Sequence, residues 1–199
     1  MTSGQRVPEI AFHRQMEDIK TVAEGLNVSV LAATTDQKRK LCNVFLTGAT
    51  GYLGLALVFA LLQQDQIGHI YVLVRADTKD EAKQRLIVGA KHAGWWQSRY
   101  LNRLVVWLGD LSEQRFGLTD AQWDCLSGIV DPEKSIHGII HSGADVKWYK
   151  NYAALRLVNV ISTCQLLECA SSSPVLQKYI FVSTAPHLDL NHMDDEEAK

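Results

Sequence analysis

One short stretch, VFLTGATGYLG at residues 44–54, constrains the fold of this 199-residue chain more than any other. Residues typical of a buried strand run directly into Gly48, Gly51 and Gly54, and an apolar helix-like segment follows. A glycine-rich turn between a strand and a helix lets the backbone approach a pyrophosphate and directs the helix N-terminus at its negative charge. Such glycines alone also mark ordinary tight turns, but the flanking strand and helix, with a second strand at the right distance, predict a dinucleotide site. The residues expected to line it here are Thr47, Gly48, Thr50, Gly51, Tyr52, Leu53 and Gly54.

The rest of the chain alternates apolar strand-like and amphipathic helix-like segments. We expect strands at 41–46, 69–74, 103–108, 135–141 and 178–183, and helices at 52–64, 79–92, 120–128 and 153–171. Thr119 is the candidate N-cap of the third of these helices. The alternation indicates a doubly wound, Rossmann-like α/β fold, a parallel sheet covered on both faces with strand order 3-2-1-4-5. We assign residues 41–199 to this dinucleotide-binding domain and residues 1–40 to a preceding helix, at 10–26, and a linker.

Composition excludes several other classes of protein. A net charge of −2 argues against a nucleic-acid-binding surface, which usually needs a basic excess. The longest apolar run, at 53–62, is too short to span a bilayer, so we expect no membrane partner. The seven histidines show no ligand spacing with cysteines or acids, so no metal site is predicted. Four cysteines without a CxxC pair, in a chain without a signal peptide, predict reduced thiols and a cytoplasmic location.

The residue that distinguishes NAD from NADP is expected at the end of the second strand, about 20 residues past the loop. An acid there would accept the ribose 2′-hydroxyl of NAD, whereas this chain has Arg75. A guanidinium suits a 2′-phosphate, so we predict NADP(H), with Arg85 on the next helix as a second clamp. Two alternatives stay open: both arginines are solvated charges, or the nearby Asp77 is a ligand of NAD.

The ends of the third and fourth strands also fit a dinucleotide. Asp110 and Leu111 follow the third strand and are suited to contact the adenine, although Asp110 is equally suited to capping a turn. Small residues follow the fourth strand, where a cofactor needs room; they are Ser142, Gly143 and Ala144. We interpret His141, which precedes them, as a core histidine and not as a catalytic one.

Taken in order, the motifs of this chain resemble those of the extended short-chain dehydrogenase/reductases. They are TGATGYLG, LVRA with the arginine of KQRL, GDL, HSGADVKW, NV at 159–160 and YIFVST. More narrowly, they are similar to the terminal thioester reductase domains of nonribosomal peptide synthetases, polyketide–peptide hybrid synthetases, α-aminoadipate reductase and carboxylic acid reductases. The resemblance covers residues 42–193, where HLDLNHM is similar to the LDTDH-type stretch of fungal members.

This resemblance implies a reaction and a partner. A carrier protein presents an acyl thioester on phosphopantetheine, NADPH reduces it, and the product leaves as an aldehyde or an alcohol. In the family, a Ser or Thr after the fifth strand and a Tyr stabilise the oxyanion, and a Lys four residues after the Tyr lowers its pKa. Thr184 matches the hydroxyl residue, with Ser183 as the alternative; each is equally able to cap the backbone.

The sequence departs from the family pattern in one decisive respect. It contains no Tyr-x-x-x-Lys: Tyr149 and Tyr152 precede the fifth strand and are followed at the fourth position by Ala153 and Arg156. We expect the family's C-terminal substrate-binding part to be missing as well. We therefore expect a truncated domain that binds NADPH but is inactive alone. The alternatives are a reductase-like domain that releases its product by Dieckmann cyclisation, without redox chemistry, and a non-catalytic nucleotide-binding regulator.

Overall fold

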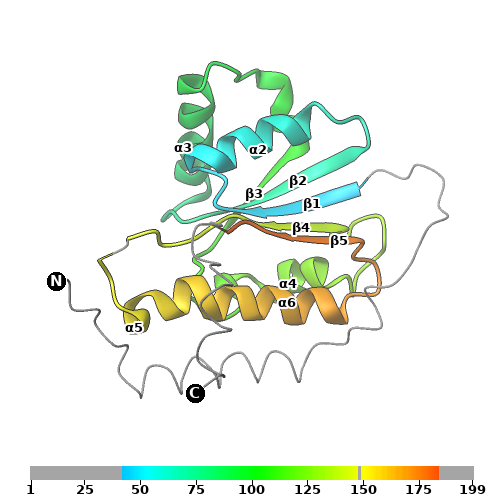
Figure 1. The fold of residues 1–199 in the computed structure, drawn as a ribbon. Coiled ribbons are helices and arrows are strands. Elements are labelled where there is room, and N and C mark those ends of the chain that lie inside the picture. The colour runs from blue at the N-terminus through cyan, green and yellow to red at the C-terminus, as the bar shows by residue number, and fades with distance from the viewer. Residues whose placement is uncertain (1–41, 148, 184–199) are drawn as a thin grey trace, which may run out of the picture.

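Five parallel strands form a single sheet in the order β3-β2-β1-β4-β5 (Figure 1). This computed structural model describes residues 42–147 and 149–183, so the predicted helix at 10–26, the linker and Thr184 lie outside the described residues. The strands are β1 (Cys42–Thr47), β2 (Ile67–Val74), β3 (Leu104–Leu108), β4 (Gly138–His141) and β5 (Lys178–Phe181). The predicted fold class and strand order are confirmed.

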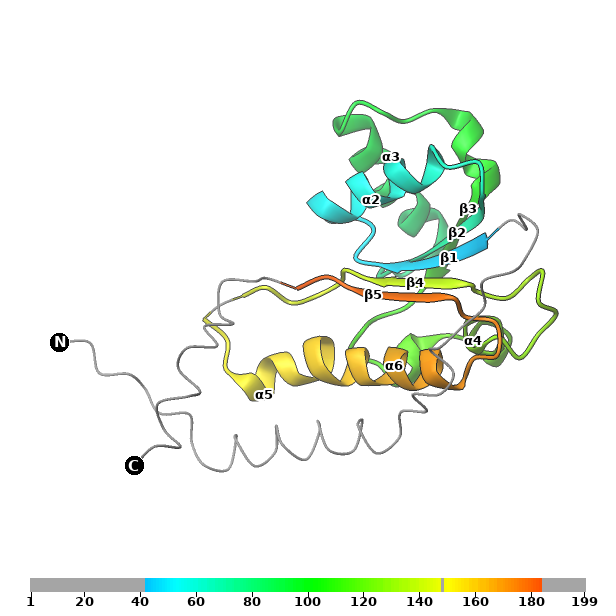
Figure 2. The same cartoon turned by 45° about the vertical axis from the view of Figure 1, so that its right-hand side comes forward.

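The helices cover both faces of this sheet. The helices are α2 (Tyr52–Leu62), α3 (Lys79–His92), α4 (Asp120–Ser127), α5 (Tyr152–Leu155) and α6 (Ser162–Ser172). In both views α2 and α3 lie on one side of the sheet and α4 and α6 on the other (Figure 1, Figure 2). Side chains alternate accordingly along β1: Val44 and Leu46 pack toward α2, and Phe45 packs toward α6. The strand is apolar on both faces because both are buried.

Short polar side chains set where α3 and α4 start. Thr119 caps α4, and Gln122 returns the bond to the Thr119 backbone in a complete capping box. The predicted N-cap is therefore confirmed. Thr78 caps α3 in the same way by accepting from the Glu81 N–H, and acidic residues in that first turn favour the positive end of the helix.

The fourth strand and the last helix differ from the predictions. The strand begins at Gly138, not at 135, because the Ser135 hydroxyl bonds the carbonyls of Val130 and Asp131 and keeps this segment in a turn. The helix runs unbroken over Tyr152–Ser172 but contains a π-helical segment, Arg156–Ile161. Apolar periodicity predicts a helix here without distinguishing its α and π turns.

The helix Tyr152–Ser172 is long and apolar enough to cross a membrane by length and composition alone. A core helix of a globular protein meets the same criterion, so this is weak evidence. Here Leu166, Cys169 and Ala170 are buried against the sheet. No disulfide joins the four cysteines, all of which lie in the described part of the chain.

Candidate functional site

The glycine loop between β1 and α2 is closed by contacts that exclude side chains. Gly48 has φ +74°, and a Cβ there would lie 2.8 Å from the backbone of Ser142 and Gly143. A Cβ on Gly54 would lie 2.0 Å from the Gly48 carbonyl oxygen. The first and third glycines of the motif are therefore required by the chain itself, which joins the loop to the end of β4 and to the first turn of α2.

The middle glycine, Gly51, is different because the chain does not require it. It is exposed, its φ is −79°, and the nearest atom to an added Cβ is the Gly48 carbonyl oxygen at 3.4 Å. Gly51 is also the N-cap of α2, and no side chain caps the helix there. The first N–H groups of a helix have no partner within it, so this N-terminus can receive an anion that approaches over Gly51.

A buried polar cluster lies directly beneath the loop. The Thr47 hydroxyl accepts hydrogen bonds from the backbone N–H groups of Ser142 (3.2 Å) and Gly143 (2.9 Å). It also lies 2.7 Å from Nδ1 of His141, its neighbour in the β1–β4 register. On the other side of the ring, His141 Nε2 lies 3.1 Å from the Thr163 hydroxyl.

His141 is a core histidine, as predicted. It is 1% exposed, and burial lowers its pKa to about 4. The neutral imidazole is thus the form present at physiological pH, with one nitrogen able to donate a hydrogen bond and the other able to accept one.

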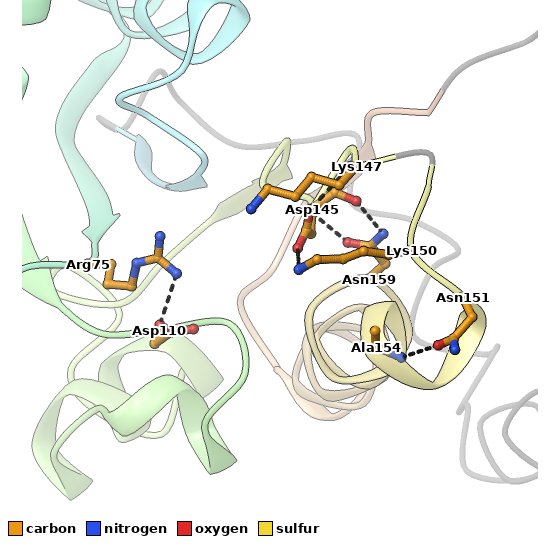
Figure 3. A network of polar contacts seen from close by, with 8 residues as sticks. All are labelled: Arg75, Asp110, Asp145, Lys147, Lys150, Asn151, Ala154 and Asn159. Atoms are coloured by element: carbon orange, nitrogen blue, oxygen red, sulfur yellow. Dashed lines mark hydrogen bonds and ion pairs between the residues drawn. The ribbon is translucent and has the colours of Figure 1, made fainter.

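Charged side chains meet at the carboxyl ends of β2 and β3. Nη1 of Arg75 lies 3.5 Å from Oδ2 of Asp110 (Figure 3), while 77% of the Arg75 side chain remains exposed. Arg85 reaches back from α3 and donates to the Arg75 carbonyl, and its role as a second clamp on a 2′-phosphate stays a prediction. The Asp77 N–H instead donates to Glu81 within the turn that starts α3.

Asp110 is held in place by its own turn. Burial alone would raise the pKa of this carboxyl, but hydrogen bonds from the Ser112 N–H and hydroxyl, together with Arg75, outweigh burial and lower the pKa. The next residue, Leu111, is half-buried, and its Cδ1 would lie 2.7 Å from a Cβ on Gly143. The ends of β3 and β4 are therefore in contact, which places these two predicted site residues together.

The loop after β4 contains a polar network that the sequence reasoning did not single out. The Asn159 side chain, on the π-helical segment, bonds both the N–H (2.7 Å) and the carbonyl (2.9 Å) of Asp145 (Figure 3). The Asp145 carboxylate accepts from Lys150 Nζ at 2.7 Å, and the Asn151 side chain caps α5. The NV motif was the available signal, but its spacing alone does not reveal this contact.

The other residues predicted for the site differ in how far they are exposed to solvent. Tyr52 (97% exposed), Leu53, Ala144 and Ser183 are open to solvent, and Thr50 is half-buried. The described ranges 42–147 and 149–183 contain no group of three or more His, Cys, Asp or Glu residues placed to hold a metal ion.

A doubly wound parallel sheet with this loop at its first strand–helix junction defines a dinucleotide-binding domain of the Rossmann class. The family of NAD-binding proteins described as male sterility protein matches residues 46–198. This chain belongs to that family, as an extended short-chain dehydrogenase/reductase of the thioester reductase type.

Three similar proteins illustrate this membership. A nonribosomal peptide synthetase-like enzyme, fsqF, of Aspergillus fumigatus is 39% identical over 160 residues, which are 80% of this chain and 11% of the relative. The solved terminal R domain from the myxalamid PKS-NRPS pathway is 29% identical with a TM-score of 0.69, over 86% of this chain and 42% of that one. A thiolation-reductase di-domain from an archaeal nonribosomal peptide synthetase is 25% identical with a TM-score of 0.58, over 84% and 41%. The chain thus spans less than half the length of each.

Proposed function

We propose that this chain is the NADPH-binding part of a thioester reductase domain, which releases a carrier-bound acyl or peptidyl thioester as an aldehyde or alcohol. The observation that carries the proposal is the glycine loop. Gly48 and Gly54 are demanded by internal contacts, whereas Gly51 is left bare over an uncapped helix N-terminus. A glycine that the chain does not need for its own packing is best explained by a ligand that approaches it.

Each part of the site has a role in this proposal. The α2 N-terminus would bind the pyrophosphate, and Arg75, assisted by Arg85, would bind the 2′-phosphate. Asp110 and Leu111 would contact the adenine. The small residues after β4 would leave room for the rest of the cofactor, and they are Ser142, Gly143 and Ala144. When bound, NADPH supplies the hydride for thioester reduction.

The partner in the proposal is a carrier protein with a phosphopantetheine-bound thioester. Support comes from the similarity to a thiolation-reductase di-domain and to a nonribosomal peptide synthetase-like enzyme. A hydroxyl just after β5, from Thr184 or Ser183, would stabilise the oxyanion. The sequence contains no Tyr-x-x-x-Lys to complete this machinery, so we propose that these 199 residues bind cofactor without turning it over.

The binding half of the proposal is tested by titrating the chain with NADPH and comparing Gly51→Ala with Gly138→Ala. An added Cβ meets nothing closer than 3.4 Å at Gly51 and 3.6 Å at Gly138, so both variants should fold, each within about 1 kcal/mol of the wild type. Gly138 lies at the opposite end of the sheet and serves as the control. NADPH affinity should fall at least tenfold, or about 1.4 kcal/mol, in Gly51→Ala alone. Equal affinity in both variants, or a wild-type chain that does not bind NADPH, would contradict the proposal.

The catalytic half is tested with a reductase domain that carries this chain together with a Tyr-x-x-x-Lys segment. It should consume NADPH, followed by absorbance, when offered an acyl-pantetheine thioester, while the 199-residue chain should not. Thr184→Ala should slow the intact domain sharply. Product release without NADPH consumption would replace the proposal with Dieckmann cyclisation.

A further inference from the structure

The hydrogens in the cluster around His141 have only one consistent arrangement. The Thr47 oxygen already accepts two backbone N–H groups, so its own proton is directed to His141 Nδ1. On the far side of the ring, the hydroxyl of Thr163 donates to the carbonyl of Asn159, and that of Ser162 to the carbonyl of Val158.

Both helix hydroxyls are therefore left as acceptors for Nε2–H of His141, at 3.1 Å from Thr163 and 3.3 Å from Ser162. The ring accepts at Nδ1 and donates at Nε2, and each of its nitrogens has a partner. A buried side chain that is satisfied on both sides is held in one orientation.

We propose that His141 is a positioning residue for the dinucleotide site: by joining Thr47 to the helix hydroxyls, it holds the glycine loop in the geometry that receives the cofactor. The inference rests on the proposed function, because it names the residue that prepares that same site. It acts through Thr47, which directly precedes Gly48, and Gly48 lies against the Ser142–Gly143 backbone.

Loss of the His141 acceptor would leave the buried Thr47 proton without a partner. The proton of this hydroxyl would then face the N–H groups of Ser142 and Gly143. These groups are donors too and cannot accept it. An unpaired buried donor is costly, so the separation of β1 and β4 at this point would change. The position of the loop depends on that separation. The two strands are already as close as they can be at this point, because a Cβ added to Gly48 would lie only 2.8 Å from the backbone of Ser142 and Gly143.

A matched control lies four residues earlier in the chain, directly before β4. His137 is 7% exposed, and its Nδ1 accepts from the Asn43 N–H at 3.1 Å. It lies beside β4 at the amino end of the sheet, away from the glycine loop. Replacing it removes a buried, hydrogen-bonded imidazole without touching the loop.

The experiment compares His141→Leu, His141→Gln and His137→Leu in the 199-residue chain. NADPH affinity is measured by titration, stability by urea unfolding, and the amide exchange of Ser142, Gly143 and Gly51 by NMR without cofactor. We expect His141→Leu to lose about tenfold or more in NADPH affinity and to accelerate exchange at all three amides. His141→Gln, which keeps one acceptor and one donor, should recover affinity to within about threefold. His137→Leu should lower stability and leave both other measurements unchanged.

Wild-type affinity and loop exchange in His141→Leu would overturn the inference, as would equal losses of affinity in the two leucine variants. If His141 were only structural, His141→Leu and His137→Leu would both lower stability and would have the same effect on NADPH affinity and on amide exchange in the loop. If His141→Leu does not fold, Thr47→Val and Thr47→Ser make the same comparison, since only serine keeps the hydroxyl. A wild-type chain that does not bind NADPH refutes the proposed function, while exchange at the three amides still decides the role of His141.

Discussion

Two pairs of polar residues connect β1 to β4 in this sheet, and they lie at opposite ends. At the amino end, Asn43 and His137 bond each other through backbone and side chain, and the Asn43 amide also bonds the carbonyls of Glu133 and Ser135. At the carboxyl end, Thr47 and His141 form the other pair. All four side chains of the two pairs are at most 7% exposed.

The two pairs differ in the groups outside the pair to which they form hydrogen bonds. The amino-end pair bonds the main chain of neighbouring turns, which fixes the frame of the domain. The carboxyl-end pair bonds the amides under the glycine loop and the hydroxyls that start α6. On the proposed function, buried polar residues of similar chemistry would serve stability at one end and the site at the other, since ligands bind at the carboxyl ends of parallel strands.

One arginine at each end of the sheet shows the same difference: Arg103 stabilises the amino end, whereas Arg75 lies at the carboxyl end beside the candidate site. The largest expected effect is the loss of stability on replacing Arg103. Arg103 directly precedes β3, and its side chain donates to the carbonyls of Leu62 (2.7 Å), Gln64 (2.8 Å), Ile67 (2.6 Å) and Gly68 (3.3 Å) at the amino end of β2. Arg103→Met removes these charge-assisted bonds and should lower the free energy of unfolding by about 3–5 kcal/mol. Urea unfolding measures the loss, and NADPH affinity of the folded chain should be unchanged.

The neighbouring Arg99 is the control for this prediction. It is exposed and lies over the Tyr100 ring at 5.4 Å, so Arg99→Met should cost no more than about 1 kcal/mol. A large loss of cofactor affinity in Arg103→Met would show that the two ends of the sheet are not separable.

Acid should destabilise the carboxyl end through His141. The pKa of its imidazole is about 4 in the folded chain and about 6.5 when unfolded, so the unfolded chain binds the extra proton between these values. Its contribution is fully present above pH 6.5 and is lost as the pH falls toward 4, by roughly 3 kcal/mol in total. The side chains in contact with the ring, Thr47, Ser162, Thr163 and Phe181, are uncharged.

The measurement is the free energy of unfolding of wild type and His141→Gln at several pH values between 4 and 7.5. The difference between the two curves isolates the histidine from the carboxyls of Asp110 and Asp145, which titrate in both proteins. Parallel curves would mean that His141 is not buried in its neutral form.

Arg75 should affect the cofactor and not the frame. On the proposed function, Arg75→Ala would remove a charge-assisted contact to the 2′-phosphate, so NADPH affinity should fall by about 1.5–3 kcal/mol and NADH affinity should stay nearly unchanged. Stability should barely change, because 77% of the side chain is exposed. Equal losses for both cofactors in parallel titrations would show that Arg75 does not distinguish them.

Arg85 should give the smallest effect. It is exposed and donates to the Arg75 carbonyl, so Arg85→Ala should lower NADPH affinity by only a few-fold, less than about 1 kcal/mol. Lys83→Ala, an exposed cation on the same helix, is the control and should change nothing. Equal NADPH affinities in Arg85→Ala and Lys83→Ala would show that Arg85 is an ordinary surface residue of α3 with no role at the cofactor site.

Local chemistry made much of this arrangement predictable from sequence. The order of strands and helices follows from apolar runs of the right length, and Thr119 as an N-cap follows from its side chain and its distance to Gln122. The glycine loop is recognisable because only glycine tolerates the conformation of Gly48 and the close approach at Gly54. The remaining candidate cofactor residues, from Arg75 to Ala144, were predicted from their places at the ends of the second, third and fourth strands, and the family resemblance added Thr184.

Contacts between distant segments were decided only by the tertiary structure. The start of β4 at Gly138 depends on hydrogen bonds from Ser135 to a turn, which no apolar pattern encodes. Arg103 looks like any surface cation until its carbonyl partners, 35 to 41 residues away, are in place. The sequence likewise predicted a core histidine at 141 but not its partner Thr47, 94 residues earlier, because hydrogen-bond partners follow from strand register, and register is set by the packing of the whole sheet.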